Sequence, residues 1–550
     1  MSNESIPESV PEPEGRRPLS DERTRAGLSR RDLLRGAVAS GALVATGGLL
    51  AACGGGSSGT AATGTAAAVR ALRAGGNLRV GVAGGGAQDT IDAHVPLTDP
   101  DVARVYQLYE PLAIRNEQFE LEMVLAESIE ADGKPDVWIV KLRDGVTFHD
   151  GRPLTADDVL YSLRRILDPK RPGRGAAAIG YIDLPRSKKI DDQTVRIALR
   201  SANVAFPDDL GQYFNGIVPV GYNPKRPVGT GPFKFQSFTP GQQSVFVKNA
   251  DYWRTGEPHV DQVTIVDFAD DTARVSALLG GQVDAITNLS GPQIAQIQSN
   301  PQTQALISRT GAWQPFTMRV DQAPFDDVRV RQAMRLLVDR EQMVAQALNG
   351  QGRIANDLYA PYDPAYASDL PQRAVDIEQA RSLLKAAGRS DLSVELTTSP
   401  VYQGIVPAAQ VLAEQAKAAG VNIKVNRVDS SVFYGPNYLK WNFAQDYWFT
   451  RNYLQQVSQS TLATAPYNET HWLDPKYGRL IKQARTELDE TTRNEMLHEA
   501  QQLEYDKGGY IVWSFSNQVD GYSSSVSGFV PSKAGVPLTN YGFRKAGFVA

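Results

Sequence analysis

The chain has 550 residues, 42% of them hydrophobic, and a formal net charge of −4. This near-neutral balance argues against a nucleic-acid-binding surface, which needs a basic patch, and the length predicts two or three domains. The single cysteine, Cys53, excludes an internal disulfide, and no stretch after it is apolar over the roughly 18 residues of a membrane span.

The first 53 residues have the order of a secretion signal. A polar segment, residues 1–28, is followed by the pair Arg30-Arg31 and then by 17 uncharged residues from Gly36 to Ala52. The arginine pair resembles a twin-arginine export signal, and "LAAC", which ends at Cys53, resembles the bacterial lipoprotein box, in which the thiol is acylated. We therefore expect residues 1–53 to be a signal sequence and Cys53 to be lipidated.

Residues 54–75 are rich in Gly, Ser, Ala and Thr, which predicts a flexible tether. The alternative for the preceding segment is a short buried hairpin helix with a core cysteine, since free cysteines are often buried. That alternative explains neither the arginine pair nor the tether.

The first part of the body predicts strands that alternate with helices. Strands are expected at 76–83, 137–142 and 259–268, a glycine-rich turn into a strand at 228–238, and a further short strand after the Gly280-Gly281 turn. Between them, the Asp150-Gly151 turn precedes a helix that Thr155 and Asp158 cap as a pair. Another helix is expected to end near Leu279.

The second part predicts α/β structure more strongly. One long helix is expected over 324–350 and another up to Gly388, and the segments 392–398, 405–419 and 421–428 form a βαβ unit with parallel strands. Two helices, 475–488 and 492–505, precede a late strand at 509–515. The fold class expected from this alternation is α/β.

Motifs for catalysis or metal binding are weak throughout. Gly55-x-Ser57-x-Gly59, and a dinucleotide-like glycine pattern that overlaps it, both lie in the tether, where neither has a strand before it or a helix after it. Ser382-x-x-Lys385 lies inside a predicted helix. The five histidines are scattered, and we expect hydrogen-bonded or surface roles for them: His94, His149, His259, His471 and His498. No cofactor or metal site is therefore expected, and binding is favoured over catalysis.

One long block identifies a resemblance. "LRDGVTFHDGRPLTADDVLYSLRR" (142–165) resembles the family 5 extracellular solute-binding proteins, the peptide receptors of ABC importers. Further matches follow in the family order: "VGTGPFKF", "NADYW", "HVDQVTI", "GGQVDAI", "PFDDVRVRQAM", "PYNETHW" and "LHEAQQLEYDKGGYIVWSF". The resemblance covers essentially everything after the tether.

The resemblance implies a class II-like periplasmic-binding-protein fold, with two lobes and an extra inserted domain. Domain I is expected to combine 76–112, 215–320 and 506–550. Domain II, 113–214, is the insertion, and domain III, 321–505, is the opposing ligand lobe. The block at 142–165 is expected to be a turn and a capped helix that stabilise domain II, not a set of ligand contacts.

The resemblance also indicates where a ligand contacts domain III. Peptide-binding members carry a tryptophan and, three residues later, an aspartate that pairs with the peptide α-amino group. Trp448 matches the tryptophan, whereas Arg451 stands at the aspartate position and reverses the charge. An arginine there disfavours an ammonium group. The expected ligand-contacting residues are Gln445, Asp446, Tyr447, Trp448 and Arg451.

Alternatives remain open at these positions. Asp446 takes the role of the aspartate if the register is shifted by a gap, Arg451 could be a surface or lobe-interface residue, and Trp448 could be core packing. We also expect an anionic or acceptor-rich group of the solute at Arg451, because guanidinium donors suit carboxylate and phosphate.

The function implied is a lipid-anchored receptor at the outer face of the cytoplasmic membrane, in the cell envelope or periplasmic space. Its expected partners are a small solute, peptide or otherwise, and the subunits of an ABC permease, with the membrane reached through the lipid, no nucleic acid, and a monomeric state. A surface sensor or adhesion protein on the same fold is the second hypothesis, and an exported hydrolase is the least favoured.

Overall fold

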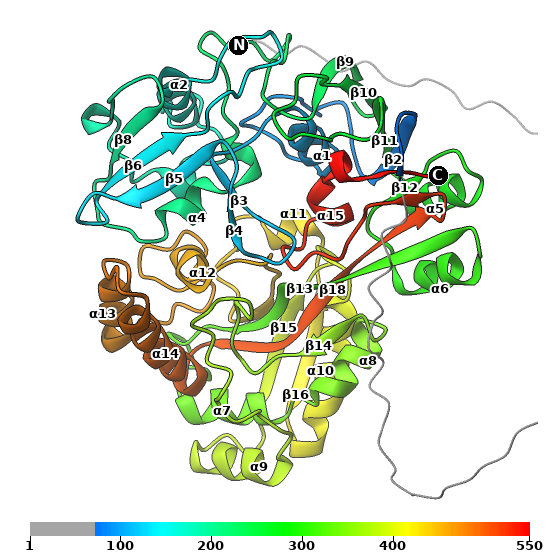
Figure 1. The fold of residues 1–550 in the computed structure, drawn as a ribbon. Helices are drawn as coiled ribbons and strands as arrows, with labels where there is room; N and C mark the ends of the chain where they lie inside the picture. Colours follow the sequence, from blue (N-terminus) through cyan, green and yellow to red (C-terminus); the bar gives the residue numbers. More distant parts are fainter. Residues whose placement is uncertain (1–71) are drawn as a thin grey trace, which may run out of the picture. The chain divides into compact units, whose positions relative to one another are not determined.

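Two long antiparallel strands form the axis of the fold. In the computed structural model, which describes residues 72–550, β13 (Thr303–Met318) pairs with β18 (Tyr510–Ser523) over most of its length. Both belong to an 11-stranded sheet with the order β16-β15-β17-β13-β18-β12-β2-β11-β10-β9, and β14 (Gly352–Ile354) is a further partner of β18. Figure 1 shows the two strands running between the two ends of this sheet.

The strands β12, β2, β11, β10 and β9 form the part of the sheet that we call the first lobe. The first lobe consists of these strands and helices: β2 (Asn77–Ala83), β9 (Phe233–Thr239), β10 (Gln243–Lys248), β11 (Gln262–Phe268), β12 (Ala285–Ile286), α1 (Asp99–Leu108), α5 (Asp271–Leu279), α6 (Gly291–Ser299) and α15 (Pro537–Tyr541). A small sheet of β1 (Leu72–Arg73), β20 (Gly547–Val549) and β19 (Val526–Ser527) joins the two ends of the described chain.

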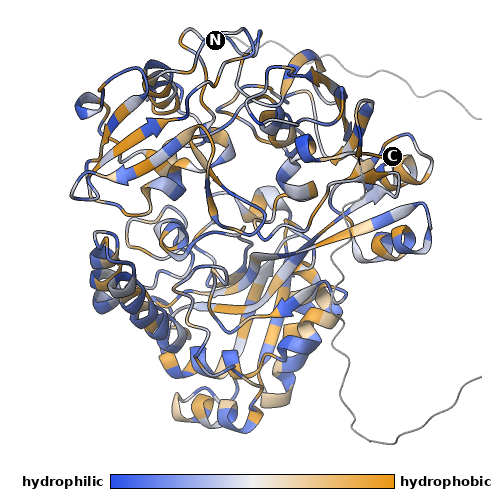
Figure 2. Ribbon diagram, in the orientation of Figure 1, coloured by the Kyte–Doolittle hydropathy of each residue, from blue (hydrophilic) through white to orange (hydrophobic). Residues whose placement is uncertain are grey.

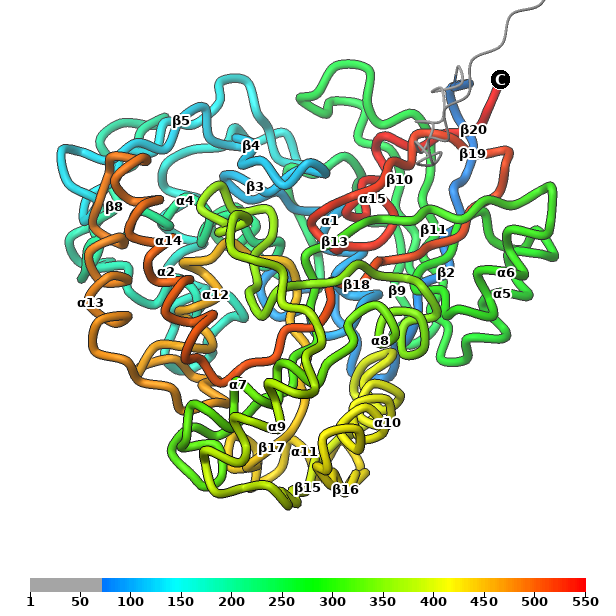
Figure 3. The backbone as a smooth tube through the Cα atoms, turned by 90° about the horizontal axis from the view of Figure 1, so that it is seen from below, coloured from blue at the N-terminus to red at the C-terminus, as the bar shows by residue number. Residues whose placement is uncertain are grey.

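The opposite end of the sheet forms the second lobe. It contains β15 (Ser393–Thr398), β16 (Asn422–Arg427), β17 (Phe443–Gln445), α7 (Val328–Leu336), α8 (Arg340–Ala347), α9 (Ile377–Ala386), α10 (Ile405–Ala416), α11 (Ser430–Phe433), α12 (Tyr453–Ser460), α13 (Pro475–Ala484) and α14 (Glu490–Lys507). β15 and β16 are parallel, as the βαβ pattern predicts. Figure 3 shows α13 and α14 running side by side.

A separate four-stranded antiparallel sheet lies in the segment between β2 and β9. Its order is β5-β6-β8-β7, with β5 (Ala126–Ala131), β6 (Val137–Leu142), β8 (Thr194–Ala198) and β7 (Lys188–Lys189). The hairpin β3 (Ala113–Arg115) and β4 (Leu121–Met123), with α2 (Ala156–Ile166), α3 (Ala176–Ile179) and α4 (Phe206–Leu210), completes this region. Its buried hydrophobic cluster draws only on residues 112–217.

Sequence patterns predict these elements well where a cap or an alternation is present. The Thr155–Asp158 capping box at α2 is confirmed, and the Asp158 carboxylate also accepts the backbone N–H of Val220, which ties the helix to a neighbouring loop. Along β6 buried Trp138, Val140 and Leu142 alternate with more exposed residues. Figure 2 shows hydrophobic and hydrophilic residues alternating in this way along several strands.

Two expectations need correction. The single helix expected over 324–350 is two helices, because Asp339 accepts the N–H of Gln342 as the N-cap of α8 and so starts a new helix after α7. The late strand expected at 509–515 continues to Ser523, and its long partner β13 was not predicted at all.

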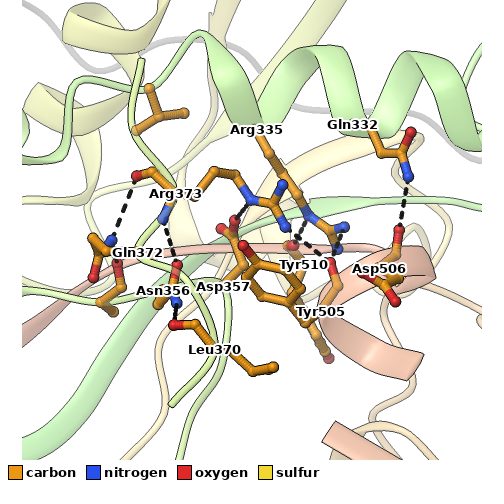
Figure 4. A network of polar contacts seen from close by, with 12 residues as sticks. Gln332, Arg335, Asn356, Asp357, Leu370, Gln372, Arg373, Tyr505, Asp506 and Tyr510 are labelled. Atoms are coloured by element: carbon orange, nitrogen blue, oxygen red, sulfur yellow. Dashed lines mark hydrogen bonds and ion pairs between the residues drawn. The ribbon is translucent and has the colours of Figure 1, made fainter. Parts of the chain in front are cut away.

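The start of β18 is held by a buried arginine network (Figure 4). Arg335 on α7 donates to the backbone carbonyls of Tyr510, Tyr505 and Gly508, at 3.0, 2.9 and 2.8 Å. Asp357 pairs with Arg340 at 2.8 Å and with Arg373 at 2.7 Å. Burial alone would raise the pKa of Asp357, but the guanidinium groups of Arg340, Arg335 and Arg373 outweigh it and lower that pKa.

Replacement of Asp357 by Asn should destabilise the protein strongly, because it leaves buried guanidinium charge without a carboxylate. We expect the free energy of unfolding to fall by about 3–5 kcal/mol in urea titrations. Asp327→Asn is the matched control, since Asp327 pairs with the exposed Arg329 and Asn can still cap α7, so its cost should stay below about 1 kcal/mol. Equal effects in the two variants would contradict this account of the network.

A second buried carboxyl group makes stability depend on pH. Glu504 on α14 accepts the hydroxyl of Tyr453 at 2.8 Å, and burial raises its pKa from 4.5 to about 7. The folded chain therefore holds this proton more tightly than the unfolded chain does. The contribution to stability is complete below pH 4.5 and is lost as the pH rises through about 7.

Glu504→Gln should remove this contribution and flatten the profile of unfolding free energy between pH 4.5 and 7 by about 1–3 kcal/mol. Urea unfolding at a series of pH values measures it. Glu495→Gln, at an exposed position of the same helix, should leave the wild-type slope in place. A Glu504→Gln profile as steep as that of the wild type would show that Glu504 does not titrate in this range.

Candidate functional site

The predicted site residues lie at the end of β17 and in the loop that follows it, next to β13. Trp448 forms an isolated antiparallel bridge with Trp313 of β13, with N–H···O distances of 3.0 and 2.9 Å in the two directions. Trp313 marks the point where the register between β13 and β18 shifts. The loop that starts at Gln445 is therefore fastened to the irregular middle of the strand that connects the two lobes.

A column of stacked aromatic rings packs against this loop at Trp448. Tyr453, Tyr359, Trp313 and Trp448 form a column with centroid distances of 5.4, 4.8 and 6.0 Å and interplanar angles of 21°, 15° and 17°. The first three rings are at most 1% exposed, and Trp448 is 8% exposed. One face of the Trp448 ring therefore packs against the core, as one of the alternatives expects. The exposed ring of Tyr467 meets the Trp448 ring edge-on, with 6.2 Å between the ring centroids.

Thr450 adds a second connection to the middle of the ribbon. Its hydroxyl oxygen accepts the N–H of Gly311, in the bulged part of β13, at 2.9 Å and donates to the carbonyl of Lys533 at 3.1 Å. Lys533 belongs to the C-terminal segment that returns to the first lobe. The loop is thus bonded both to the middle of β13 and to the C-terminal segment.

Arg451 carries a charge that no acidic side chain neutralises. Among residues 72–550 no carboxylate lies within ion-pair distance of its guanidinium, and its one side-chain hydrogen bond, to Gln456 Oε1, is 3.5 Å long. The guanidinium lies 5.6 Å from the centroid of the Trp448 ring. Burial lowers the pKa of Arg451, although part of its side chain is exposed.

Two side chains from distant parts of the chain, Tyr213 and Asp99, lie within electrostatic range of this loop. Tyr213, next to Tyr106 and Phe214, interacts with Arg451, and Asp99 at the start of α1 interacts with Tyr447. Burial raises the pKa of Asp99, and the side-chain amide of Asn288 donates to its carboxylate at 2.8 Å.

The other three predicted residues, Gln445, Asp446 and Tyr447, have different surroundings. Tyr447 stacks on Tyr402 at 4.7 Å and 16°. Asp446 accepts hydrogen bonds from the hydroxyls of Tyr434 and Tyr438, and Gln445 is 1% exposed with neither end of its amide paired. Asp446, Tyr447, Trp448 and Arg451 lie in the loop after β17, which ends at Gln445, and of these five residues Tyr447 and Arg451 are the ones that are not buried.

Several members of the site were missed from the sequence. Asp99, Tyr213, Trp313 and Tyr402 are far away in the chain and carried no signal that linked them to Trp448. Glu469, which lies beside Asp446, and Tyr467 sit in the "PYNETHW" match, which pointed to the family but was not interpreted as part of the site.

Two of the histidines, His94 and His149, form the hydrogen bonds expected of them. His94 and His149 bond the carbonyls of Gly216 and Gly231, and burial lowers the pKa of each to about 4. Within the described part of the chain no cluster of three His, Cys, Asp or Glu side chains could hold a metal ion, and no helix is long and apolar enough to cross a membrane. Arg30, Arg31 and Cys53 lie outside the described residues.

Known proteins match both the sequence and the fold. Residues 120–468 match the family model "Bacterial extracellular solute-binding proteins, family 5 Middle". Di/tripeptide-binding protein 2 of Pseudomonas aeruginosa is 26% identical over 74% of this chain and 83% of its own, and heme-binding protein A of Haemophilus influenzae is 30% identical over 56% and 62%.

Among solved structures, the periplasmic binding protein DppA of Helicobacter pylori, in complex with the peptide STSA, superposes with a TM-score of 0.70 at 21% identity, over 87% of this chain and 99% of its own. This likeness confirms the expected periplasmic-binding-protein fold. Because the family model spans more than half of the chain, the protein belongs to the family 5 bacterial extracellular solute-binding proteins.

Proposed function

We propose that the protein is the receptor of an ABC importer that captures a small organic solute between its two lobes, with an anionic group of the solute at Arg451. The observation that carries the proposal is the guanidinium of Arg451, which lies over Trp448 without a carboxylate partner. A partly buried arginine is strongly favoured beside a carboxylate or phosphate, which its planar donors bind in pairs. Family relatives that bind di- and tripeptides support a peptide-like or other small organic solute.

The division into domains belongs to the same proposal. Domain I (76–112, 215–320 and 506–550) corresponds to the first lobe, domain II (113–214) to the region of the four-stranded sheet, and domain III (321–505) to the second lobe. Support comes from the hydrophobic clusters, since one draws on 112–217, another on 78–109, 218–306 and 522–546, and a third mainly on 316–443. β13 and β18 connect the lobes, and the irregular register around Trp313 is where we expect them to bend.

We further propose that the protein acts as a monomer that is anchored by lipid at Cys53 to the outer face of the cytoplasmic membrane. The solute is bound and passed unchanged to the permease, so no residue has a catalytic role. The support for the anchor is the order of the arginine pair, the apolar segment, Cys53 and the tether.

Arg451→Ala should weaken binding of the solute that copurifies with the protein, once mass spectrometry has identified it. The lost charge-assisted contact should cost about 10- to 150-fold in affinity, measured by calorimetry, with the fold intact. Arg427→Ala, at an exposed end of β16 in the same lobe, should leave the affinity unchanged. The proposal is wrong if trialanine binds the wild type tightly and Arg451→Ala alters the affinity for neither trialanine nor the copurified solute.

Cys53→Ser should release the protein from the membrane into the periplasm or medium, because the acylated thiol is the anchor. Fractionation and a salt wash measure the distribution. The double variant Arg30→Lys, Arg31→Lys should instead keep the precursor in the cytoplasm. A Ser variant that stays on the membrane after the salt wash would refute the lipoprotein interpretation.

A further inference from the structure

The segment 113–214, which we propose as domain II, contacts the second lobe through residues outside the predicted solute contacts. The backbone N–H of Val204 donates to the carbonyl of Arg485, at the end of α13, at 2.9 Å. Gln455 on α12 donates from Nε2 to Oδ1 of Asp209 on α4 at 3.1 Å. Figure 1 shows α4 beside α12. Both bonds join domain II directly to the second lobe, without β13 or β18 between them.

The same contact buries apolar surface. Ala205 is 8% exposed, and in the described chain it belongs with Val204 to a hydrophobic cluster whose other members come from residues 313–515. Phe206 and Leu210 of α4 belong instead to the cluster of domain II itself. The segment around the start of α4 therefore has one set of side chains in its own core and another set against the second lobe.

Asp209 is the polar centre of the contact. Its carboxylate accepts the hydroxyl of Tyr181 at 2.6 Å and the amide of Asn203 at 3.0 Å, in addition to the amide of Gln455. Two of these three donors belong to domain II, so Asp209 keeps them when the lobes separate, and water can replace Gln455. The contact therefore breaks without leaving a buried charge unpaired.

Domain II is also held on the first lobe by ion pairs. Arg165 on α2 pairs with Asp92, which follows β2, and Glu122 on β4 pairs with Arg254, which precedes β11, at 2.6 Å. We therefore expect domain II to move with the first lobe. A rotation of the lobes about the irregular part of the β13–β18 pair then separates α4 from α12 and α13.

The contact is small and partly polar. One backbone hydrogen bond, one hydrogen bond to a carboxylate and the packing of Ala205 and Val204 hold it together. Each of these contributes modestly, because water competes for the same groups when the contact is open. Small and partly polar interfaces between domains of one chain open and close readily.

We propose that residues 203–209 of domain II and the facing residues of α12 and α13 form a latch, which holds the two lobes in their closed arrangement without touching the solute. The inference rests on the capture of a solute between two lobes, as in the proposed function. A solute that binds the closed form shows an affinity reduced by the fraction of the protein that is closed. A latch that raises this fraction therefore raises the affinity.

The latch lies close to the candidate site along the chain. α12 begins at Tyr453, shortly after Arg451, and its Gln456 accepts the one side-chain hydrogen bond of Arg451. Closure at Gln455 and occupation of Arg451 by a solute therefore act on the same short helix.

The experiment measures the separation of domain II from the second lobe by pulsed electron paramagnetic resonance. Spin labels are attached through Lys134→Cys, in domain II, and Lys482→Cys, on α13, both at exposed positions of the full-length chain with Cys53→Ser. The protein is freed of copurified solute before the measurement. With the latch intact we expect a population at the short distance of the closed form, in equilibrium with one at a longer distance.

Two variants break the latch from opposite sides. Ala205→Glu puts a charge into the apolar contact, and Gln455→Ala removes the second-lobe donor to Asp209. The ratio of closed to open protein should fall about tenfold or more in Ala205→Glu and about threefold in Gln455→Ala. Ser201→Glu is the matched control, because it adds the same charge at an exposed position of the same segment, and its ratio should equal that of the wild type.

The same variants should weaken binding of the copurified solute, once mass spectrometry has identified it, by up to the same factors. The loss should come mainly from faster dissociation, because the latch closes after the solute has entered. At saturating solute every variant should reach the short distance of the wild type. Circular dichroism and urea unfolding check that each variant is folded.

Equal populations in the wild type, Ala205→Glu and Gln455→Ala would overturn the proposal. A wild type without any closed population before solute is added, or an equal loss in Ser201→Glu, would overturn it as well. These outcomes concern the protein without solute, so they are independent of the affinity lost in Arg451→Ala, which tests the proposed function. A solute that binds tightly without shortening the distance would instead refute capture between the lobes.

Discussion

The antiparallel pairing of β13 with β18 is the interaction on which the rest of the structure depends. Each strand starts in one lobe and ends in the other, so this pair of strands joins the lobes and lies between their strands in the shared sheet. The ribbon is regular at its two ends and irregular around Trp313. A break in the ladder costs hydrogen bonds and increases local twist, so this is where we expect the lobes to move relative to each other.

The loop that follows β17 is attached to this irregular part of the β13–β18 pair, and the attachment has a mechanical consequence. Trp448 is bridged to Trp313, and Thr450 bonds both Gly311 and Lys533. A solute that contacts Trp448 or Arg451 therefore contacts a residue that is itself bonded to this irregular part of β13, or the neighbour of one that is. Because a ligand shifts a conformational equilibrium only by its difference in affinity for the two states, such direct contact is an economical way to favour closure.

The second lobe distributes its buried charge unevenly. Around Asp357 several guanidinium groups face one carboxylate and are satisfied mainly by backbone carbonyls. Within residues 72–550, no Lys, Arg or His forms an ion pair with Asp446 or Glu469, and no carboxylate forms one with Arg451. The first arrangement is closed and holds the start of β18. The other two belong to the candidate site and its immediate surroundings.

The sequence by itself determined the class of fold, the family and most local elements, because caps, turns and alternation act over a few residues. The Thr155–Asp158 box and the βαβ unit are both visible in short stretches. Only the tertiary structure decided which residues meet at the site. β13 was invisible as a strand that joins two lobes, because pairing across about 200 residues leaves no periodic signal. The meeting of Asp446 with Glu469, and of Arg451 with Tyr213, likewise depends on long-range packing that no local pattern encodes.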